Sequence, residues 1–191
     1  NGEYIENPEG GLIWIESTKK AVKELSKRYY ITVINQAPFI KGINNDLQAI
    51  TTLQRELKSK NVNNQYFFCG RDIVGHKYFN LPIEDSWNLL NDSQKGLSGV
   101  ESTARLSITH YLGKTEVVAV TNKGIPGLKG SENGVVIFKL LRGAQDAPLK
   151  GKVAIVGRNP KAIWFSGYED RVLYDEAGLF TQSMQDTSSV S

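Results

Sequence analysis

The sequence predicts an α/β fold, in which helices and parallel strands alternate over residues 18–115 and a β-rich antiparallel region follows over residues 116–178. Two patterns support this prediction. Amphipathic stretches at helical spacing alternate with short apolar β runs in the first region, and glycine-separated β runs fill the second. With 191 residues, 40% of them hydrophobic, the chain is long enough for one domain with a genuine core. Residues 1–17 are predicted to be irregular, and the polar tail at residues 179–191 is expected to be disordered.

The first region contains three predicted helices and three predicted strands in alternation. The helices are expected at residues 18–28, 46–60 and 82–95. The strands are expected at residues 30–34, with an extension toward residue 40, and at residues 65–69 and 104–111. Because only a few residues connect most of these elements, we expect a parallel sheet with helical crossovers.

Each predicted helix has a start signal and an apolar stripe. Ser17 or Thr18 is a candidate N-cap of the first helix, Asp46 is expected to cap the second, and Pro82 is expected to begin the third. The residues predicted to form the inner faces are Val22 and Leu25, then Leu47, Ile50, Leu53 and Leu57, then Ile83, Trp87 and Leu90.

After residue 114 the pattern changes to short β runs. Four runs are predicted to be strands joined by hairpins: EVVAVTN, GVVIFKLL, GKVAIVG and AIWFSGY. The glycine-rich segment at residues 124–134 does not open a helix after a strand. We therefore interpret it as a hairpin loop and not as a phosphate-binding loop.

Charge and cysteine content exclude several classes of partner. The net charge of +3 is small and dispersed, which argues against nucleic acid. No apolar run approaches the length of a membrane span, so we expect no membrane partner and a cytoplasmic protein. The single cysteine, Cys69, excludes an internal disulfide and is expected to behave as a small buried hydrophobe. His76 and His110 lack the spacing of a zinc site.

Polar side chains follow each of the three parallel strands at its carboxyl end. They are Asn35 and Gln36, then residues 70–72, then residues 107–114. Ligands of parallel α/β folds bind at this end of the strands, so these side chains are candidates for a common site. The alternative is that the amides satisfy loop backbone groups and the charged residues are solvated.

Three segments carry a family resemblance. ITVINQAPFIKGINND, VNNQYFFCGRDIVGHKYFNLPIEDSWNLL and GLSGVESTARLSITHYLGKTEVV occur in the order expected for the lysine 2,3-aminomutase family of radical S-adenosylmethionine proteins. The sequence resembles that family over about residues 18–120 and more loosely to about residue 174.

The resemblance implies the carboxyl-terminal portion of a partial (β/α) barrel from a longer enzyme. Such enzymes are isomerases that use a [4Fe-4S] cluster to cleave S-adenosylmethionine, and the aminomutases use pyridoxal phosphate while an amino group migrates between adjacent carbons. A cluster needs three thiolates, and this chain has only Cys69. The chain alone is therefore expected to be inactive, with the cluster ligands elsewhere in the parent protein.

The resemblance also assigns cofactor roles. Asn35 and Gln36 match an Asn-Gln pair whose amide lies near S-adenosylmethionine. Lys114 stands where the family's pyridoxal phosphate lysine follows a run of glycines, of which only Gly113 remains here. A solvated lysine at the head of a hairpin is the alternative for Lys114.

Substrate roles follow in the same way. Asp72 falls near an aspartate that holds the distal ammonium of lysine, and Arg71 beside it either neutralises that charge or binds a substrate carboxylate. Ser107 replaces a second substrate aspartate, which weakens the case for lysine as the substrate. The expected partner is therefore a small-molecule amino acid.

The alternative hypothesis is a non-enzymatic α/β domain that serves as a binding or assembly module. An upstream reading frame that encodes the three-cysteine motif would favour the enzyme. Because an incomplete barrel leaves an open sheet edge, we also expect a homo-oligomer or a domain-swapped dimer.

Overall fold

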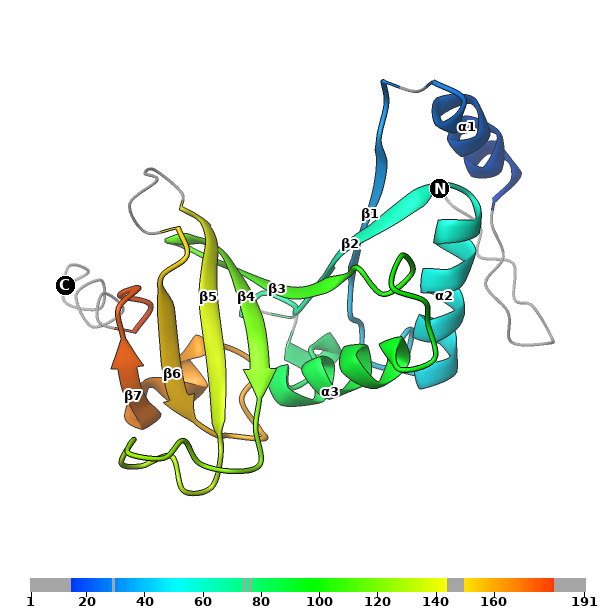
Figure 1. The fold of residues 1–191 in the computed structure, drawn as a ribbon. Coiled ribbons are helices and arrows are strands. Elements are labelled where there is room, and N and C mark those ends of the chain that lie inside the picture. Colours follow the sequence, from blue (N-terminus) through cyan, green and yellow to red (C-terminus); the bar gives the residue numbers. More distant parts are fainter. Residues whose placement is uncertain (1–14, 29, 74, 76, 144–149, 181–191) are drawn as a thin grey trace.

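Seven strands of the described residues form one sheet, and their spatial order is the order of the sequence, β1 to β7 (Figure 1). The computed structural model describes residues 15–28, 30–73, 75, 77–143 and 150–180. Residues 1–14 of the segment predicted to be irregular, residues 181–191 of the predicted tail and His76 lie outside the described residues. The described ends of both segments are structured, since a helix begins at Glu16 and the side chains of Leu179 and Phe180 are buried in the core.

Helices and strands alternate in the first part of the chain, as predicted, and a β meander follows them. In chain order they are α1 Glu16–Ser26, β1 Val33–Pro38, α2 Leu47–Ser59, β2 Val62–Phe68, η1 Lys77–Phe79, α3 Ile83–Gln94, β3 Arg105–His110, β4 Gly113–Val120, β5 Val135–Gly143, β6 Val153–Gly157, η3 Phe165–Arg171 and β7 Val172–Asp175.

The first three strands are parallel, as the sequence predicted. β1 pairs with β2 and β2 pairs with β3, both in parallel register, and α2 and α3 form the two crossovers. Both helices lie on one side of this part of the sheet (Figure 1). Every later pair, from β3–β4 to β6–β7, is antiparallel. The fold is therefore mixed α/β, with the antiparallel strands continuing the parallel sheet.

Helix α2 shows how local chemistry sets an element. The side chain of Asp46 accepts a hydrogen bond from the Ala49 N–H at 2.8 Å, which confirms the predicted N-cap. Ile50 and Leu57 are buried as the stripe predicted. Leu47, however, remains 47% exposed, so the predicted stripe is not buried over its whole length.

Helix α1 forms without a buried face. Its N-cap position is Ile15, without a side-chain cap, so the predicted Ser17 or Thr18 cap is wrong. Val22 is only half-buried and Leu25 is 39% exposed.

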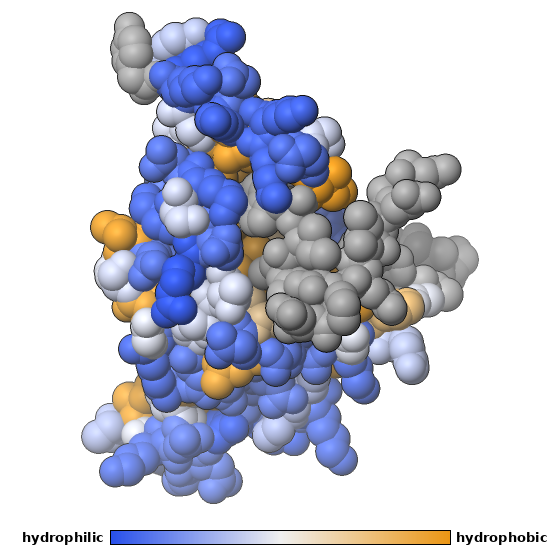
Figure 2. Space-filling view, turned by 90° about the vertical axis from the view of Figure 1, so that its right-hand side faces the viewer, coloured by the Kyte–Doolittle hydropathy of each residue, from blue (hydrophilic) through white to orange (hydrophobic). Residues whose placement is uncertain are grey.

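The side of the molecule that carries α1 and α2 is mainly hydrophilic in Figure 2. In the part of the chain that the structure describes, no helix is both long and apolar enough to cross a membrane.

The run AIWFSGY is not a strand, and this prediction was wrong. The segment folds instead into a turn and the 3-10 helix η3, and the last strand, β7, follows it. Tertiary hydrogen bonds hold the turn, since Asn159 Nδ2 donates to the Gly167 carbonyl at 2.7 Å and the Ala162 carbonyl accepts from the Ile83 N–H at 2.9 Å. A Cβ at Gly167 would lie 2.7 Å from the Ala162 Cβ, so the turn requires glycine there.

One hydrophobic core runs through both parts of the sheet. Phe67 and Ile108 from the parallel strands and Phe138 from the antiparallel strands belong to the same buried cluster. An ion pair reinforces the junction, because the carboxylate of Glu84 on α3 binds the guanidinium of Arg158, which follows β6.

Candidate functional site

Asn35 and Gln36 lie on opposite sides of β1, because successive side chains of a strand alternate between the two faces. Asn35 is two residues before Ala37 and so lies on the same face of β1, and Ala37 packs against the core. The amide nitrogen of Asn35 is buried without a hydrogen-bond partner among the described residues. Gln36 is exposed on the other face, where its Nε2 donates to Gln65 Oε1 at 2.9 Å. The two amides of the motif therefore do not converge.

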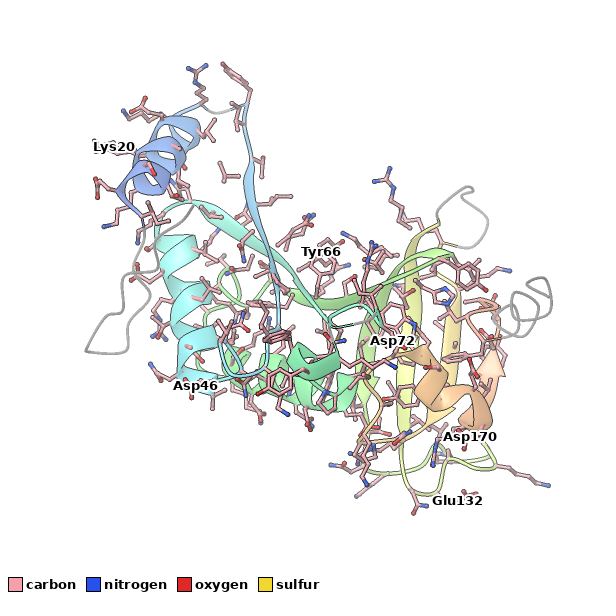
Figure 3. The ribbon with its side chains drawn as sticks, turned by 180° about the vertical axis from the view of Figure 1, so that it is seen from behind. Lys20, Asp46, Tyr66, Asp72, Glu132 and Asp170 are labelled. Atoms are coloured by element: carbon pink, nitrogen blue, oxygen red, sulfur yellow. The ribbon has the colours of Figure 1, made fainter. Side chains whose placement is uncertain are left out.

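Gln36 and Lys114 lie on the same face of the sheet. Gln36 is the register partner of Tyr66, and the Lys114 ammonium lies 4.1 Å from the centre of the Tyr66 ring. The same ammonium is 4.9 Å from the ring of Phe68, two residues further along β2. Figure 3 shows Tyr66 and Asp72 in the middle of the molecule, whereas Asp46, Glu132 and Asp170 lie at its periphery.

The environment of Lys114 makes its amine less basic. Partial desolvation lowers the pKa of Lys114, and the positive charge of Arg142 lowers it further. A lysine with a lowered pKa exposes more of the neutral amine that attacks carbonyl groups. This chemistry fits a carbonyl cofactor such as pyridoxal phosphate at Lys114.

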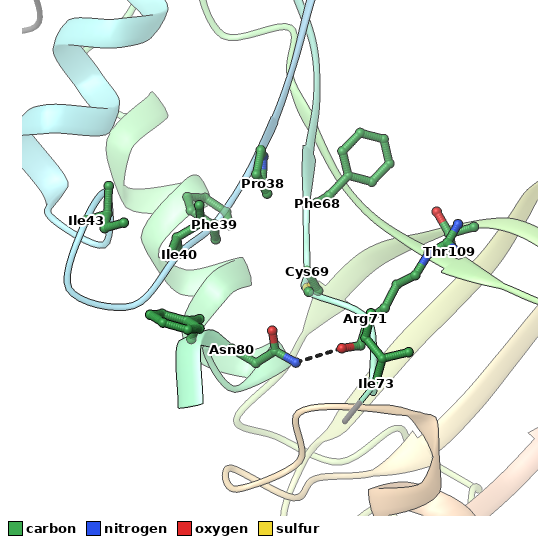
Figure 4. Close-up of a pocket in the computed structure, with 12 residues that line it drawn as sticks. Pro38, Phe39, Ile40, Ile43, Phe68, Cys69, Arg71, Ile73, Asn80 and Thr109 are labelled. Atoms are coloured by element: carbon green, nitrogen blue, oxygen red, sulfur yellow. Dashed lines mark hydrogen bonds between the residues drawn. The ribbon is translucent and has the colours of Figure 1, made fainter. Parts of the chain in front are cut away.

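A pocket of about 650 Å³ lies at the carboxyl ends of β1 and β2, within the size range of small-molecule sites (Figure 4). We call it the strand-end pocket. Its lining residues are mostly apolar: Pro38, Phe39, Ile40, Ile43, Phe68, Cys69, Gly70, Arg71, Ile73, Phe79, Asn80 and Thr109. Phe68 connects it to Lys114, and Thr109 is the register partner of Lys114.

Of the predicted substrate residues, Arg71 lines the strand-end pocket and Asp72 is not among its lining residues. The Asp72 carboxylate forms an ion pair with Lys77 at 3.3 Å, without the directional geometry of a hydrogen bond. Asn80 holds the backbone beside them, because its Nδ2 donates to the Arg71 carbonyl at 3.1 Å. A Cβ at Gly70 would lie 1.7 Å from Asn80 Oδ1. The side chain of Asn80 can therefore occupy this position only because residue 70 is glycine.

Ser107 is fully buried in the sheet. Its hydroxyl donates to the Thr115 carbonyl at 3.1 Å, across the β3–β4 pair. The structure thus brings together Gln36, Lys114 and, through Phe68, Arg71, while Asn35, Asp72 and Ser107 have other contacts.

Sequence reasoning missed Tyr66, Phe68 and Asn80 as parts of this region. The first two form an aromatic pair at alternate positions of β2, and Lys114 reaches them from β4, two strands away, so no local pattern in the sequence links the three residues. Asn80 gave no signal, because its role depends on the fold of residues 70–80.

The described residues do not fit an iron–sulfur cluster. Cys69 is buried, and desolvation raises the pKa of its thiol to about 12, which opposes the thiolate that a cluster requires. Among the residues with described positions, no three His, Cys, Asp or Glu side chains are placed to hold a metal ion. His110 is likewise part of the core, where its ring packs 4.7 Å from that of Phe165.

The fold and site define a mixed α/β protein with a ligand-sized pocket at the carboxyl ends of its parallel strands. The chain is 33% identical over 166 residues to a protein described as "Putative L-lysine 2,3-aminomutase" from Aquifex aeolicus (strain VF5). The match covers 86% of this chain and 41% of the relative, so the chain spans about two fifths of the length of that relative. No protein-family model matches the chain. The match supports the relation to the lysine 2,3-aminomutase family that the motifs indicated.

Proposed function

We propose that this chain is the carboxyl-terminal portion of a radical S-adenosylmethionine isomerase that resembles lysine 2,3-aminomutase and acts on an amino acid. The observation that carries the proposal is 33% identity over 86% of the chain. Three parallel strands with helical crossovers and a pocket at their carboxyl ends also fit part of a (β/α) barrel. In this proposal, the face that carries Gln36 and Lys114 is part of the inner wall of the barrel.

The cofactor residues of the proposal are Gln36, Asn35 and Lys114. Gln36 offers a neutral amide to S-adenosylmethionine from the exposed face of β1. Asn35 lies on the core side of that strand, where its amide nitrogen has no hydrogen-bond partner among the described residues. Lys114 would hold pyridoxal phosphate, which supplies an electron sink beside the amino group of the substrate when bound. The Lys114 ammonium lies over the rings of Tyr66 and Phe68, which stabilise its charged form, whereas partial desolvation and the charge of Arg142 lower its pKa and favour the neutral amine.

Of the three predicted substrate residues, the proposal keeps Arg71 as the substrate contact and gives Asp72 and Ser107 supporting positions. Arg71 supplies a cation at the strand-end pocket, and the carboxylate of Asp72 pairs with the ammonium of Lys77. The buried hydroxyl of Ser107 supports β3 from within the sheet. The iron–sulfur cluster belongs in this proposal to another part of the parent protein, since the one cysteine of this chain does not fit it.

The test of the enzyme is reductive cleavage of S-adenosylmethionine by the protein from the complete reading frame. We expect that frame to encode three clustered cysteines, and the anaerobically reconstituted protein to release 5′-deoxyadenosine. Cys69→Ala should retain the visible absorption of the reconstituted cluster, because the buried thiol of Cys69 does not fit a cluster ligand. A complete frame without the three cysteines would leave the non-enzymatic binding or assembly module as the better account.

The test of the cofactor site is reaction of the chain with pyridoxal phosphate. We expect a new visible absorption band and, after borohydride reduction, a covalent adduct that peptide mapping places on Lys114. Lys114→Ala should abolish both signals, whereas Lys139→Ala, at an exposed lysine on β5, should leave them unchanged. An adduct spread over several lysines, or retained in Lys114→Ala, would contradict the assignment.

A further inference from the structure

Among the described residues that line the strand-end pocket, one side chain is charged, and it is a cation. Arg71 is the single ionisable base among the described lining residues, and no Asp or Glu is among them. The remaining lining is dominated by apolar side chains from the end of β1 and from η1, such as Phe39, Ile43 and Phe79. In Figure 4 the Arg71 side chain extends in the direction of Thr109.

The backbone of Arg71 is fixed while its guanidinium is available. Its carbonyl oxygen accepts hydrogen bonds from Asn80 Nδ2 at 3.1 Å and from the Ile73 N–H at 3.0 Å. No ion pair or hydrogen bond joins its guanidinium to a described residue. The neighbouring carboxylate, Asp72, pairs with Lys77 instead. Arg71 therefore offers its donors to a ligand and is not neutralised by the described part of the chain.

A guanidinium beside apolar surface selects ligands by charge. It binds a carboxylate through two parallel hydrogen bonds, and this interaction strengthens where apolar walls reduce the local dielectric constant. The same guanidinium repels an ammonium group. The apolar lining favours a hydrocarbon body on the ligand, because burying that body removes apolar surface from water.

We propose that the strand-end pocket binds a small carboxylate with an uncharged apolar body and discriminates against ligands with a distal ammonium. This inference rests on the proposed function in taking the pocket as the substrate site. The substrate is then an amino acid whose carboxylate Arg71 holds and whose side chain is apolar, and a diamino acid such as lysine is disfavoured.

The experiment compares probes of equal length and opposite charge. Binding of hexanoate and of hexylammonium to the chain is measured by titration calorimetry, followed by L-norleucine and L-lysine, which differ by a terminal ammonium. We expect hexanoate to bind at least about tenfold more tightly than hexylammonium, and norleucine more tightly than lysine, because a charged hydrogen bond is worth about one to two orders of magnitude in affinity.

Variants show whether Arg71 is responsible. Arg71→Met keeps much of the side-chain length without the charge and should weaken hexanoate binding about 10- to 100-fold. Arg55→Met is the matched control, because Arg55 is an exposed arginine on α2 outside the pocket. It should leave binding unchanged. Circular dichroism of each variant confirms that the fold is retained.

Four outcomes would overturn the inference. They are equal or tighter binding of hexylammonium, tighter binding of lysine than of norleucine, unchanged hexanoate binding in Arg71→Met, and no binding of any probe. Weaker lysine binding in Asp72→Asn, combined with a preference for lysine, would instead place an ammonium site at Asp72. Release of 5′-deoxyadenosine by the complete protein is measured separately, so failure of the pocket inference is distinguishable from failure of the proposed function.

Discussion

Replacing Glu84 with alanine should destabilise the junction between the parallel and antiparallel parts of the sheet. The Glu84 side chain is 1% exposed and contacts two groups that follow β6. Its Oε2 accepts from Arg158 Nε at 2.8 Å and lies 2.7 Å from a second guanidinium nitrogen, and its Oε1 accepts from the Asn159 N–H at 2.7 Å. The Glu84→Ala substitution thus leaves the partly buried guanidinium of Arg158 without its carboxylate partner and the Asn159 N–H without an acceptor.

The expected cost follows from these contacts. Removing one partner of a buried ion pair costs about 3–5 kcal/mol. Arg158 is 24% exposed and retains a hydrogen bond to Asn122, so we expect the lower part of that range, about 3 kcal/mol. Glu84→Gln keeps the shape and one acceptor, and should cost less than Glu84→Ala.

Urea unfolding followed by circular dichroism measures the free energy of unfolding of each variant. The matched control is Glu56→Ala, which removes a half-exposed carboxylate that pairs with Lys60 on α2 and should cost less than about 1 kcal/mol. A Glu84→Ala cost within about 1 kcal/mol of that control would refute the reasoning, since the buried pair would then contribute no more than a surface pair.

Two further predictions concern pH and assembly. Burial lowers the pKa of His110 from 6.5 to about 4. Between these two pH values the unfolded state binds more protons than the folded state. The contribution of neutral His110 to the free energy of unfolding should therefore be complete above pH 6.5 and should be lost as the pH falls toward 4. This slope of the unfolding free energy against pH should shrink in His110→Gln, and an unchanged slope would contradict it. β1 lies at the edge of the sheet, and Ile34 on this strand is 45% exposed. Because an uncovered edge strand can pair with a second copy of the chain, we expect light scattering to show a dimer. The Ile34→Lys substitution places a charge on this strand and should weaken the dimer. A monomer at every concentration would contradict the open-edge prediction.

The features that were predictable from the sequence depend on local chemistry. Asp46 caps α2 because its carboxylate reaches a backbone N–H three residues ahead, and the sequence alone contains that relation. The parallel order of β1, β2 and β3 follows from alternating helix and strand patterns with short connections. The glycine-rich segment at residues 124–134 joins β4 to β5, as a hairpin loop was expected to do.

The features that were not predictable depend on partners far away in the sequence. Glu84 resembles an ordinary acidic residue of a first helical turn, and its burial requires Arg158, 74 residues later. The apolar run containing Phe165 suits a strand by composition. It became a turn and a 3-10 helix because Asn159 and Ile83 bind its backbone.

Alternation along a strand decides how the predicted cofactor residues can cooperate. Asn35 is partly buried on the core side of β1 and Gln36 is exposed on the other side, so the two amides of the pair do not point toward one ligand. Gln36 shares that face with Tyr66 and Lys114, and Phe68 links Lys114 to the strand-end pocket. A ligand that occupies the pocket and approaches the Lys114 amine would therefore pass Phe68. In the proposed enzyme, the guanidinium of Arg71 would bind the carboxylate of that ligand, while the less basic amine of Lys114 would hold the carbonyl cofactor.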